Sequence, residues 1–159
     1  MDYGIVIEKI HQELKAYWGK GKVADYIPAL AEVEPKRYGI AIETLDGHSF
    51  QVGDADIRFS IQSISKVFAL AMVTRHLGDR IWKFVGREPS GNPFNSLVQL
   101  EYEHGIPRNP FINAGALVVT DRLMSLYEQP KDAILQFVRS ICGNDDIYYD
   151  KHIARSERE

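Results

Sequence analysis

The sequence predicts an α+β domain in which several helices lie beside a short antiparallel sheet. A hairpin signal comes from Asp46-Gly47, which separates two short runs of alternating apolar and polar residues. Apolar residues then recur at helical spacing over 61–77, 114–126 and 130–142. The 159 residues are 45% hydrophobic and 26% charged, as is typical of one soluble globular domain.

The first predicted element is an amphipathic helix that ends near Gly19. One of its faces carries apolar residues at intervals of three or four, namely Val6, Ile10, Leu14 and Tyr17. A loop follows over 19–35 and contains the apolar residues Tyr26, Ile27, Pro28 and Leu30. This loop is therefore expected to pack against the protein.

Two strands are predicted over 38–45 and 48–52. In the first strand, Ile40 and Ile42 alternate with smaller or polar residues. A type I′ turn requires positive φ at both central residues, and Asp-Gly is a common pair there. The sequence therefore predicts a two-residue hairpin turn at Asp46-Gly47.

Helices dominate the rest of the chain. The longest pattern covers 61–77, and Gly78 suits the position just after its end. The remaining elements are a short amphipathic segment at 81–85, one or two helical turns at 97–104, an extended loop at 106–113, and helices at 114–126 and 130–142. Asn113 suits an N-cap, Pro130 a first helical position and Gly143 a helix end.

Composition excludes several classes of protein. The net charge of −3 does not fit a nucleic-acid binder, and no apolar run is long enough for a membrane span. The first residues lack a secretory-signal pattern, and the lone Cys142 favours a reducing compartment, so a cytoplasmic location is expected. None of the five histidines has the spacing of a metal ligand pair, so no metal site is predicted.

The pattern Ser63-Ile-Ser-Lys66 can carry chemistry. Residues three apart share one face of a helix, so the Lys66 amine can approach the Ser63 hydroxyl. Burial lowers the pKa of an amine, and a neutral amine can activate a serine nucleophile. The alternative is a chance match, because the chain has nine serines.

Five blocks, in the same order, resemble the serine-dependent glutaminases of bacteria. The blocks are 21–30, 59–66, 89–96, 109–116 and 154–157. The resemblance implies a β-lactamase/penicillin-binding-protein-like fold, a helical cluster on an antiparallel sheet that is incomplete in this chain. Residues 1–159 would be the N-terminal portion of a single glutaminase domain whose C-terminal remainder is absent.

The same resemblance implies hydrolysis of the side-chain amide of L-glutamine to L-glutamate and ammonia, with no cofactor. Ser63 matches the nucleophile that would form a glutamyl ester, and Lys66 matches its base. The predicted substrate-binding residues are Tyr26, Gln62, Ser63, Asn113 and Glu157. By charge, Glu157 suits the α-ammonium group of glutamine, while the amide of Asn113 suits its α-carboxylate.

The chain departs from the family in length, since such enzymes are about twice as long. It contains no Lys-Ser-Gly, the motif that would contribute to the oxyanion hole, so the chain alone is expected to be inactive. Two alternatives stay open: a β-lactamase-like serine hydrolase of another substrate, and a non-catalytic fragment acting as an interaction module. The full-length form is expected to be a homo-oligomer, with no nucleic-acid or membrane partner.

Overall fold

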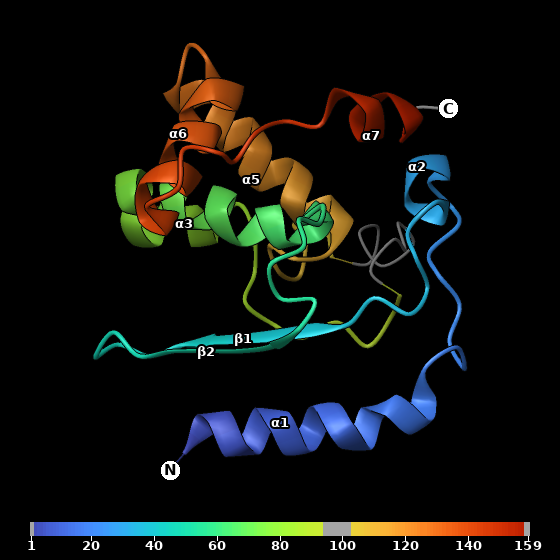
Figure 1. Ribbon diagram of the computed structural model, residues 1–159. Coiled ribbons are helices and arrows are strands. Elements are labelled where there is room, and N and C mark those ends of the chain that lie inside the picture. Colours follow the sequence, from blue (N-terminus) through green and yellow to red (C-terminus); the bar gives the residue numbers. More distant parts are fainter. Residues whose placement is uncertain (1, 94–102, 158–159) are drawn as a thin grey trace. The chain divides into compact units, whose positions relative to one another are not determined.

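The computed structural model describes residues 2–93 and 103–157, which fall into two compact units (Figure 1). Unit 1 comprises Met1–Ser60 and Asp150–Glu159, and unit 2 comprises Ile61–Tyr149. The predicted combination of helices with an antiparallel hairpin is confirmed. The helical turns predicted at 97–104 lie largely outside the described residues.

Unit 1 begins with helix α1 (Tyr3–Leu14), which continues into the 3-10 turn η1 (Lys15–Tyr17). Asp2 caps the helix, because its carboxylate accepts a hydrogen bond of 3.2 Å from the backbone N–H of Ile5. The end at residue 17 agrees with the predicted end near Gly19. Ile7 and His11 form the buried side of this helix.

The hairpin consists of β1 (Gly39–Glu43) and β2 (Ser49–Gly53), paired antiparallel with Ile40 opposite Val52 and Ile42 opposite Phe50. These four side chains are partly buried while their neighbours are exposed, which confirms the predicted alternation. Helix α1 packs against β2, where the ring of Tyr3 lies 5.9 Å from that of Phe50.

The predicted type I′ turn is wrong. Gly47 has φ of 85°, but Asp46 does not have positive φ. The backbone N–H of Gly47 donates to Thr44 O at 3.0 Å, and that of Thr44 donates to His48 O at 2.9 Å. The connection is therefore a three-residue loop, a tight turn followed by a left-handed glycine. Asp-Gly marked the hairpin, but the glycine alone takes the left-handed conformation.

The loop predicted over 19–35 contains the short helix α2 (Pro28–Ala31), which the sequence did not indicate. Ile27 before it is 4% exposed, as expected of a packed loop, whereas Tyr26 is 78% exposed. Helix α7 (Lys151–Ser156) lies beside α2. The two are joined where the backbone N–H of Ala29 donates to Ser156 Oγ at 2.9 Å.

Unit 2 contains a 3-10 turn η2 (Gln62–Ile64) that leads directly into helix α3 (Ser65–Leu77). Helix α3 ends at Gly78, whose φ of 55° fits glycine, and a second 3-10 segment η3 (Gly78–Lys83) follows. Helices α5 (Asn113–Leu126) and α6 (Pro130–Cys142) complete the unit. Pro130 starts α6 and left-handed Gly143 ends it, as predicted.

Helix α3 is the centre of unit 2 and contacts η3, α5 and α6. Its core consists of Ala69, Met72, Val73, Ile81, Val85, Val119 and Leu123, all 8% exposed or less. This packing fixes the start of α3 relative to the start of α5. Within residues 2–93 and 103–157, no helix is both long and apolar enough to cross a membrane.

Candidate active site

Ser63 and Lys66 lie at the junction between η2 and α3. The helical geometry runs through this junction, so the two side chains share one side of the chain, as the spacing predicts. Ser63 is exposed and Lys66 is partly buried. Among the described residues, no hydrogen bond joins the Ser63 hydroxyl to Lys66 Nζ; contacts of this kind are often long before substrate binds.

Lys66 Nζ is held by two oxygens of unit 2. It donates to the backbone carbonyl of Phe111 at 2.9 Å and to Asn113 Oδ1 at 2.8 Å. Desolvation lowers the pKa of Lys66 from its ordinary 10.5. A neutral amine has two N–H bonds and one lone pair. Both acceptors here can be satisfied by the N–H bonds, which leaves the lone pair free to take a proton.

Asn113 does not cap α5, so that prediction is wrong. The N-cap is Ile112, and Asn113 is the first residue of the helix. Its side-chain oxygen instead accepts from Lys66 Nζ, 47 residues away in sequence. As the first residue inside the helix, Asn113 is not at the N-cap position from which a side chain accepts first-turn N–H groups, and the packing of α3 against α5 brings Lys66 to its oxygen instead.

Gln62, the residue before the predicted nucleophile, has φ of 41°. This left-handed conformation is uncommon for a residue other than glycine, and such outliers concentrate at functional sites. The Gln62 carbonyl accepts a 2.7 Å hydrogen bond from the Ser65 hydroxyl. The bend therefore precedes Ser63 and is tied to the first residue of α3.

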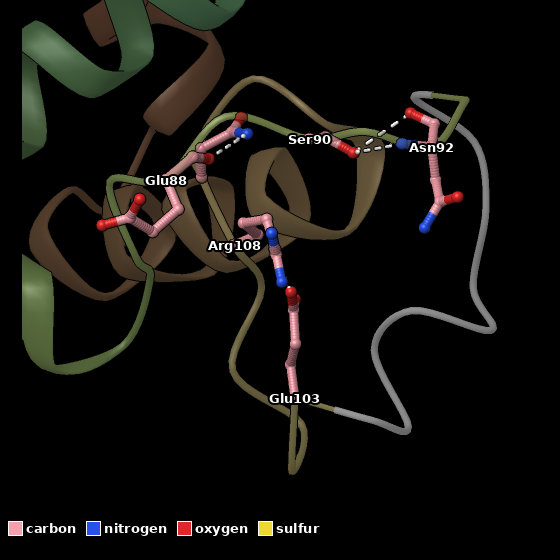
Figure 2. Close-up of polar contacts among 6 residues, drawn as sticks. Glu88, Ser90, Asn92, Glu103 and Arg108 are labelled. Carbon is pink, nitrogen blue, oxygen red and sulfur yellow. Dashed lines mark hydrogen bonds and ion pairs between the residues drawn. The ribbon is translucent and has the colours of Figure 1, made fainter.

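The segment that supplies the Phe111 carbonyl is held by backbone hydrogen bonds to residues 86–88. The backbone N–H of Gly86 donates to Pro107 O at 2.7 Å, and that of Glu88 donates to Arg108 O at 3.0 Å. Figure 2 shows Glu88 beside Arg108, whose side chain pairs with Glu103. These contacts hold residues 107–109 in place before the chain enters α5.

A pocket of about 400 Å³ lies beside this segment. Its wall is largely apolar and includes Leu70, Trp82 and Phe111, and the guanidinium of Arg87 lies 5.1 Å from the centre of the Trp82 ring. Asn109 also lines it. Neither Ser63 nor Lys66 is among the residues that line this cavity.

Tyr26 and Glu157 belong to unit 1, whereas the other predicted site residues belong to unit 2. Both are exposed. They lie next to the two ends of the Ala29–Ser156 hydrogen bond, because Tyr26 precedes α2 and Glu157 follows α7. Unit 1 thus holds near each other two segments that are more than a hundred residues apart in sequence.

No cluster of three or more histidine, cysteine or acidic side chains that could hold a metal occurs within the described part of the chain. The Nε2 atom of His76 lies 2.6 Å from the hydroxyl oxygen of Tyr127. The ring of His11 stacks against that of Tyr38, with the ring centres 5.8 Å apart. Cys142 is exposed. The absence of a metal and of any other cofactor stays a prediction.

Two contributors were not identified from the sequence. The Phe111 backbone carbonyl has no side-chain signal at all. Asn109 does carry a sequence signal. An asparagine often forms a turn in which its side-chain oxygen accepts from backbone N–H groups a few residues later. Its Oδ1 accepts from Phe111 N at 2.9 Å and from Ile112 N at 3.1 Å.

The chain is similar to known proteins over most of its length. The family model described as Glutaminase matches residues 21–159. The glutaminase of Salmonella arizonae is 58% identical over 155 residues, which cover 97% of this chain and 50% of the relative. The chain therefore spans about half the length of the curated relatives that it matches.

Solved structures give the same result. The probable glutaminase ybaS superimposes with a TM-score of 0.79 at 32% identity, over 95% of this chain and 51% of the other. Mglu in its glutamate form gives a TM-score of 0.75 at 36% identity, over 92% and 34% of the two chains. These likenesses confirm the predicted β-lactamase-like fold. With its Ser63–Lys66 pair on such a scaffold, the chain belongs to the glutaminase family.

Proposed function

We propose that this chain carries the nucleophile and base of a glutaminase that hydrolyses the side-chain amide of L-glutamine. The observation that carries the proposal is the environment of Lys66. Its amine is fixed by the Phe111 carbonyl and Asn113 Oδ1, its pKa is lowered by burial, and it lies one helical turn from Ser63. This is the set of properties that an amine needs to act as a base for a hydroxyl.

The reaction follows from that geometry in two steps. Lys66 Nζ takes the hydroxyl proton as Ser63 Oγ attacks the γ-carbonyl carbon of glutamine. The tetrahedral intermediate then expels the amide nitrogen as ammonia, after the same proton is returned to it by Lys66. A glutamyl ester of Ser63 results, and water activated by the neutral amine cleaves it to release glutamate.

The remaining predicted residues complete the proposal. Glu157 pairs with the α-ammonium group of glutamine, and Tyr26 and Gln62 contact the same ligand. The amide of Asn113 offers an N–H to the α-carboxylate while its oxygen holds Lys66. Mglu, a relative with 36% identity, has been solved in a glutamate form, which supports glutamate and its amide as the ligand class.

Location and assembly are also proposals. We place the protein in the cytoplasm, on the basis of its single cysteine. We expect its full-length form to be a homo-oligomer, because large apolar side chains such as Leu117 and Met124 on α5 are 70% and 62% exposed. Light scattering at several concentrations tests the assembly, and a monomer throughout would contradict it.

The function is tested by ammonia release from glutamine. Because the chain spans half of its relatives' length, the assay uses the longest form of the protein that can be expressed, next to this 159-residue chain. We expect the longer form to be active and this chain alone to be inactive, as part of a single glutaminase domain. Absence of activity in both forms would contradict the proposal, and hydrolysis of nitrocefin instead would favour the β-lactamase-like alternative.

A further inference from the structure

Asn109 lies at the centre of a hydrogen-bond network one step removed from Lys66. We propose that Asn109 is a positioning residue for the base: its side chain fixes the backbone of 109–112 so that the Phe111 carbonyl accepts from Lys66 Nζ. The inference rests on the proposed function for its catalytic consequence. Its structural part concerns only contacts within unit 2.

The side-chain oxygen of Asn109 accepts two backbone hydrogen bonds. Its Oδ1 accepts from the backbone N–H of Phe111 at 2.9 Å and from that of Ile112 at 3.1 Å. The peptide that carries the Phe111 carbonyl is the same peptide that carries the Ile112 N–H. A hydrogen bond to that N–H therefore sets the direction of the carbonyl, which points to Lys66 Nζ at 2.9 Å.

The Asn109 side chain is itself anchored by residue 88. Its Nδ2 donates to the backbone carbonyl of Glu88 at 2.9 Å. Glu88 in turn donates its backbone N–H to Arg108 O at 3.0 Å. Two hydrogen bonds therefore join Glu88 to the consecutive residues Arg108 and Asn109. All the polar atoms of this side chain are thereby used to fix backbone.

The backbone of Asn109 is also in close contact with α5. A Cβ atom on Gly115 would lie 1.9 Å from the carbonyl oxygen of Asn109, so the first turn of the helix packs directly on that peptide. Asn113, the other acceptor for Lys66, is in the same turn. The positions of both acceptors, the Phe111 carbonyl and Asn113 Oδ1, therefore depend on the position of the Asn109 peptide. A shift of that peptide would move one acceptor relative to the other.

The catalytic consequence follows from the two N–H bonds of a neutral lysine. If both acceptors are in place, the lone pair of Nζ is directed away from them, and Ser63 is one helical turn away on the same side. If the Phe111 carbonyl turns, the amine can rotate and its lone pair loses direction. A misplacement of about 1 Å in such a group costs on the order of 10²-fold in rate.

The test compares Asn109→Ala with Asn109→Asp in the longest expressed form of the protein. Alanine removes both accepted hydrogen bonds, and aspartate keeps an oxygen that can accept them. Aspartate also replaces the Nδ2 donor with an oxygen that faces the Glu88 carbonyl, so it loses that anchor. We expect kcat for glutamine to fall about 10- to 100-fold in Asn109→Ala with KM changed less than about 3-fold, and Asn109→Asp to recover only part of that loss. Equal losses in both variants, or a loss confined to KM, would overturn the proposal.

Arg108→Ala is the matched control for a merely structural effect. It removes the Arg108–Glu103 pair from the same segment but leaves the backbone bond at Arg108 intact (Figure 2). We expect it to lower the melting temperature with kcat within about 2-fold of the unmodified protein. If it lowers kcat as much as Asn109→Ala does, general loosening explains both and the positioning role fails.

A readout that needs no activity separates this inference from the proposed function. Amide hydrogen exchange at Phe111 and Ile112 is expected to accelerate at least about 10-fold in Asn109→Ala and to stay slow in Arg108→Ala. Unchanged exchange in Asn109→Ala would overturn the inference even if the protein hydrolyses glutamine. An inactive unmodified protein would contradict the proposed function alone, because the exchange comparison would still be measured.

Discussion

The two units present their predicted site residues in different ways. In unit 2, Lys66 is partly buried and held by two oxygens, and the chain around it is fixed by further hydrogen bonds. In unit 1, Tyr26 and Glu157 are exposed, and the connection nearest to both is the Ala29–Ser156 hydrogen bond. A group that moves a proton needs a fixed direction and a shifted pKa, whereas a group that binds a charged ligand needs access.

This difference assigns different kinetic effects to the Ser63–Lys66 pair of unit 2 and to the two exposed residues of unit 1. Changes at Ser63 or Lys66 should lower kcat, because those groups act on the reacting bond. Changes at Tyr26 or Glu157 should raise KM, because those groups are proposed to hold parts of glutamine that do not react. A change in KM alone at Ser63 or Lys66, or a change in kcat alone at Tyr26 or Glu157, would break that division between chemistry and binding.

The largest effect is expected for Ser63→Ala. Removing the nucleophile eliminates the ester intermediate, so glutamine hydrolysis should fall by at least about 10³-fold. Loss of a burst of ammonia release, together with loss of the glutamyl adduct on the peptide in mass spectrometry, checks the cause. Ser125→Ala is the matched control, since that serine donates only to the Asp121 carbonyl within α5. A burst that survives in Ser63→Ala would contradict the mechanism.

The next effect is at Lys66. Lys66→Met should lower kcat about 10²- to 10⁴-fold, which is the range of general-base contributions. Lys66→Arg should not restore it, because a guanidinium stays protonated. Full activity in Lys66→Arg would show that the positive charge, and not the basic amine, is what the site uses.

The pH dependence follows from the same residue. Only the neutral amine can accept the Ser63 proton, so kcat should rise as pH rises through the pKa of Lys66. Burial lowers that pKa from 10.5, so the rise should be centred below 10.5. A profile measured with glutamine at saturating concentration checks this. An absence of any rise below pH 10.5 would contradict the role of Lys66 as base.

A smaller effect, on KM and not on kcat, is expected for Glu157 of unit 1. Glu157→Gln removes the charge proposed to pair with the glutamine α-ammonium, so KM should rise about 10-fold or more while kcat changes little. Glu13→Gln, another exposed glutamate of unit 1, is the matched control and should leave both constants unchanged. If Glu157→Gln lowers kcat at constant KM, the division between the two units fails.

The sequence predicted elements where local rules decide the outcome. Pro130 and Gly143 bound α6, and apolar spacing located α3, because caps and periodicity act within one segment. The turn at Asp46 was misjudged, because Asp-Gly suits both a two-residue type I′ turn and a three-residue loop in which the glycine alone has positive φ. Helix α2 was missed because its N-terminus is completed by Ser156 from far along the chain.

The site shows the same contrast. Spacing indicated Ser63 and Lys66 as a candidate pair, since residues three apart share one face of a helix, and the family resemblance supplied their predicted roles. The acceptors of Lys66 could not be found that way. Asn113 carries a signal that reads equally well as a helix cap, and the Phe111 carbonyl carries none. Only the packing of α3 against α5 brings these atoms to the lysine.

The smallest expected effect concerns Ser156, which satisfies the Ala29 N–H at the start of α2. Neither residue before Ala29 closes that end, because Pro28 has no N–H and Ile27 makes no side-chain cap. Ser156→Ala should therefore cost about 1 kcal/mol in the free energy of unfolding and accelerate amide exchange at Ala29. Ser140→Ala is the control and should cost less than about 0.5 kcal/mol, because the Ser140 hydroxyl donates to the Phe137 carbonyl on the surface of α6.

Ser156 also adjoins Glu157 in the sequence. A few-fold rise in KM with unchanged kcat in Ser156→Ala would therefore extend the binding role of unit 1 to a residue that does not touch the ligand. A fall in kcat would place the segment after α7 with the chemistry instead.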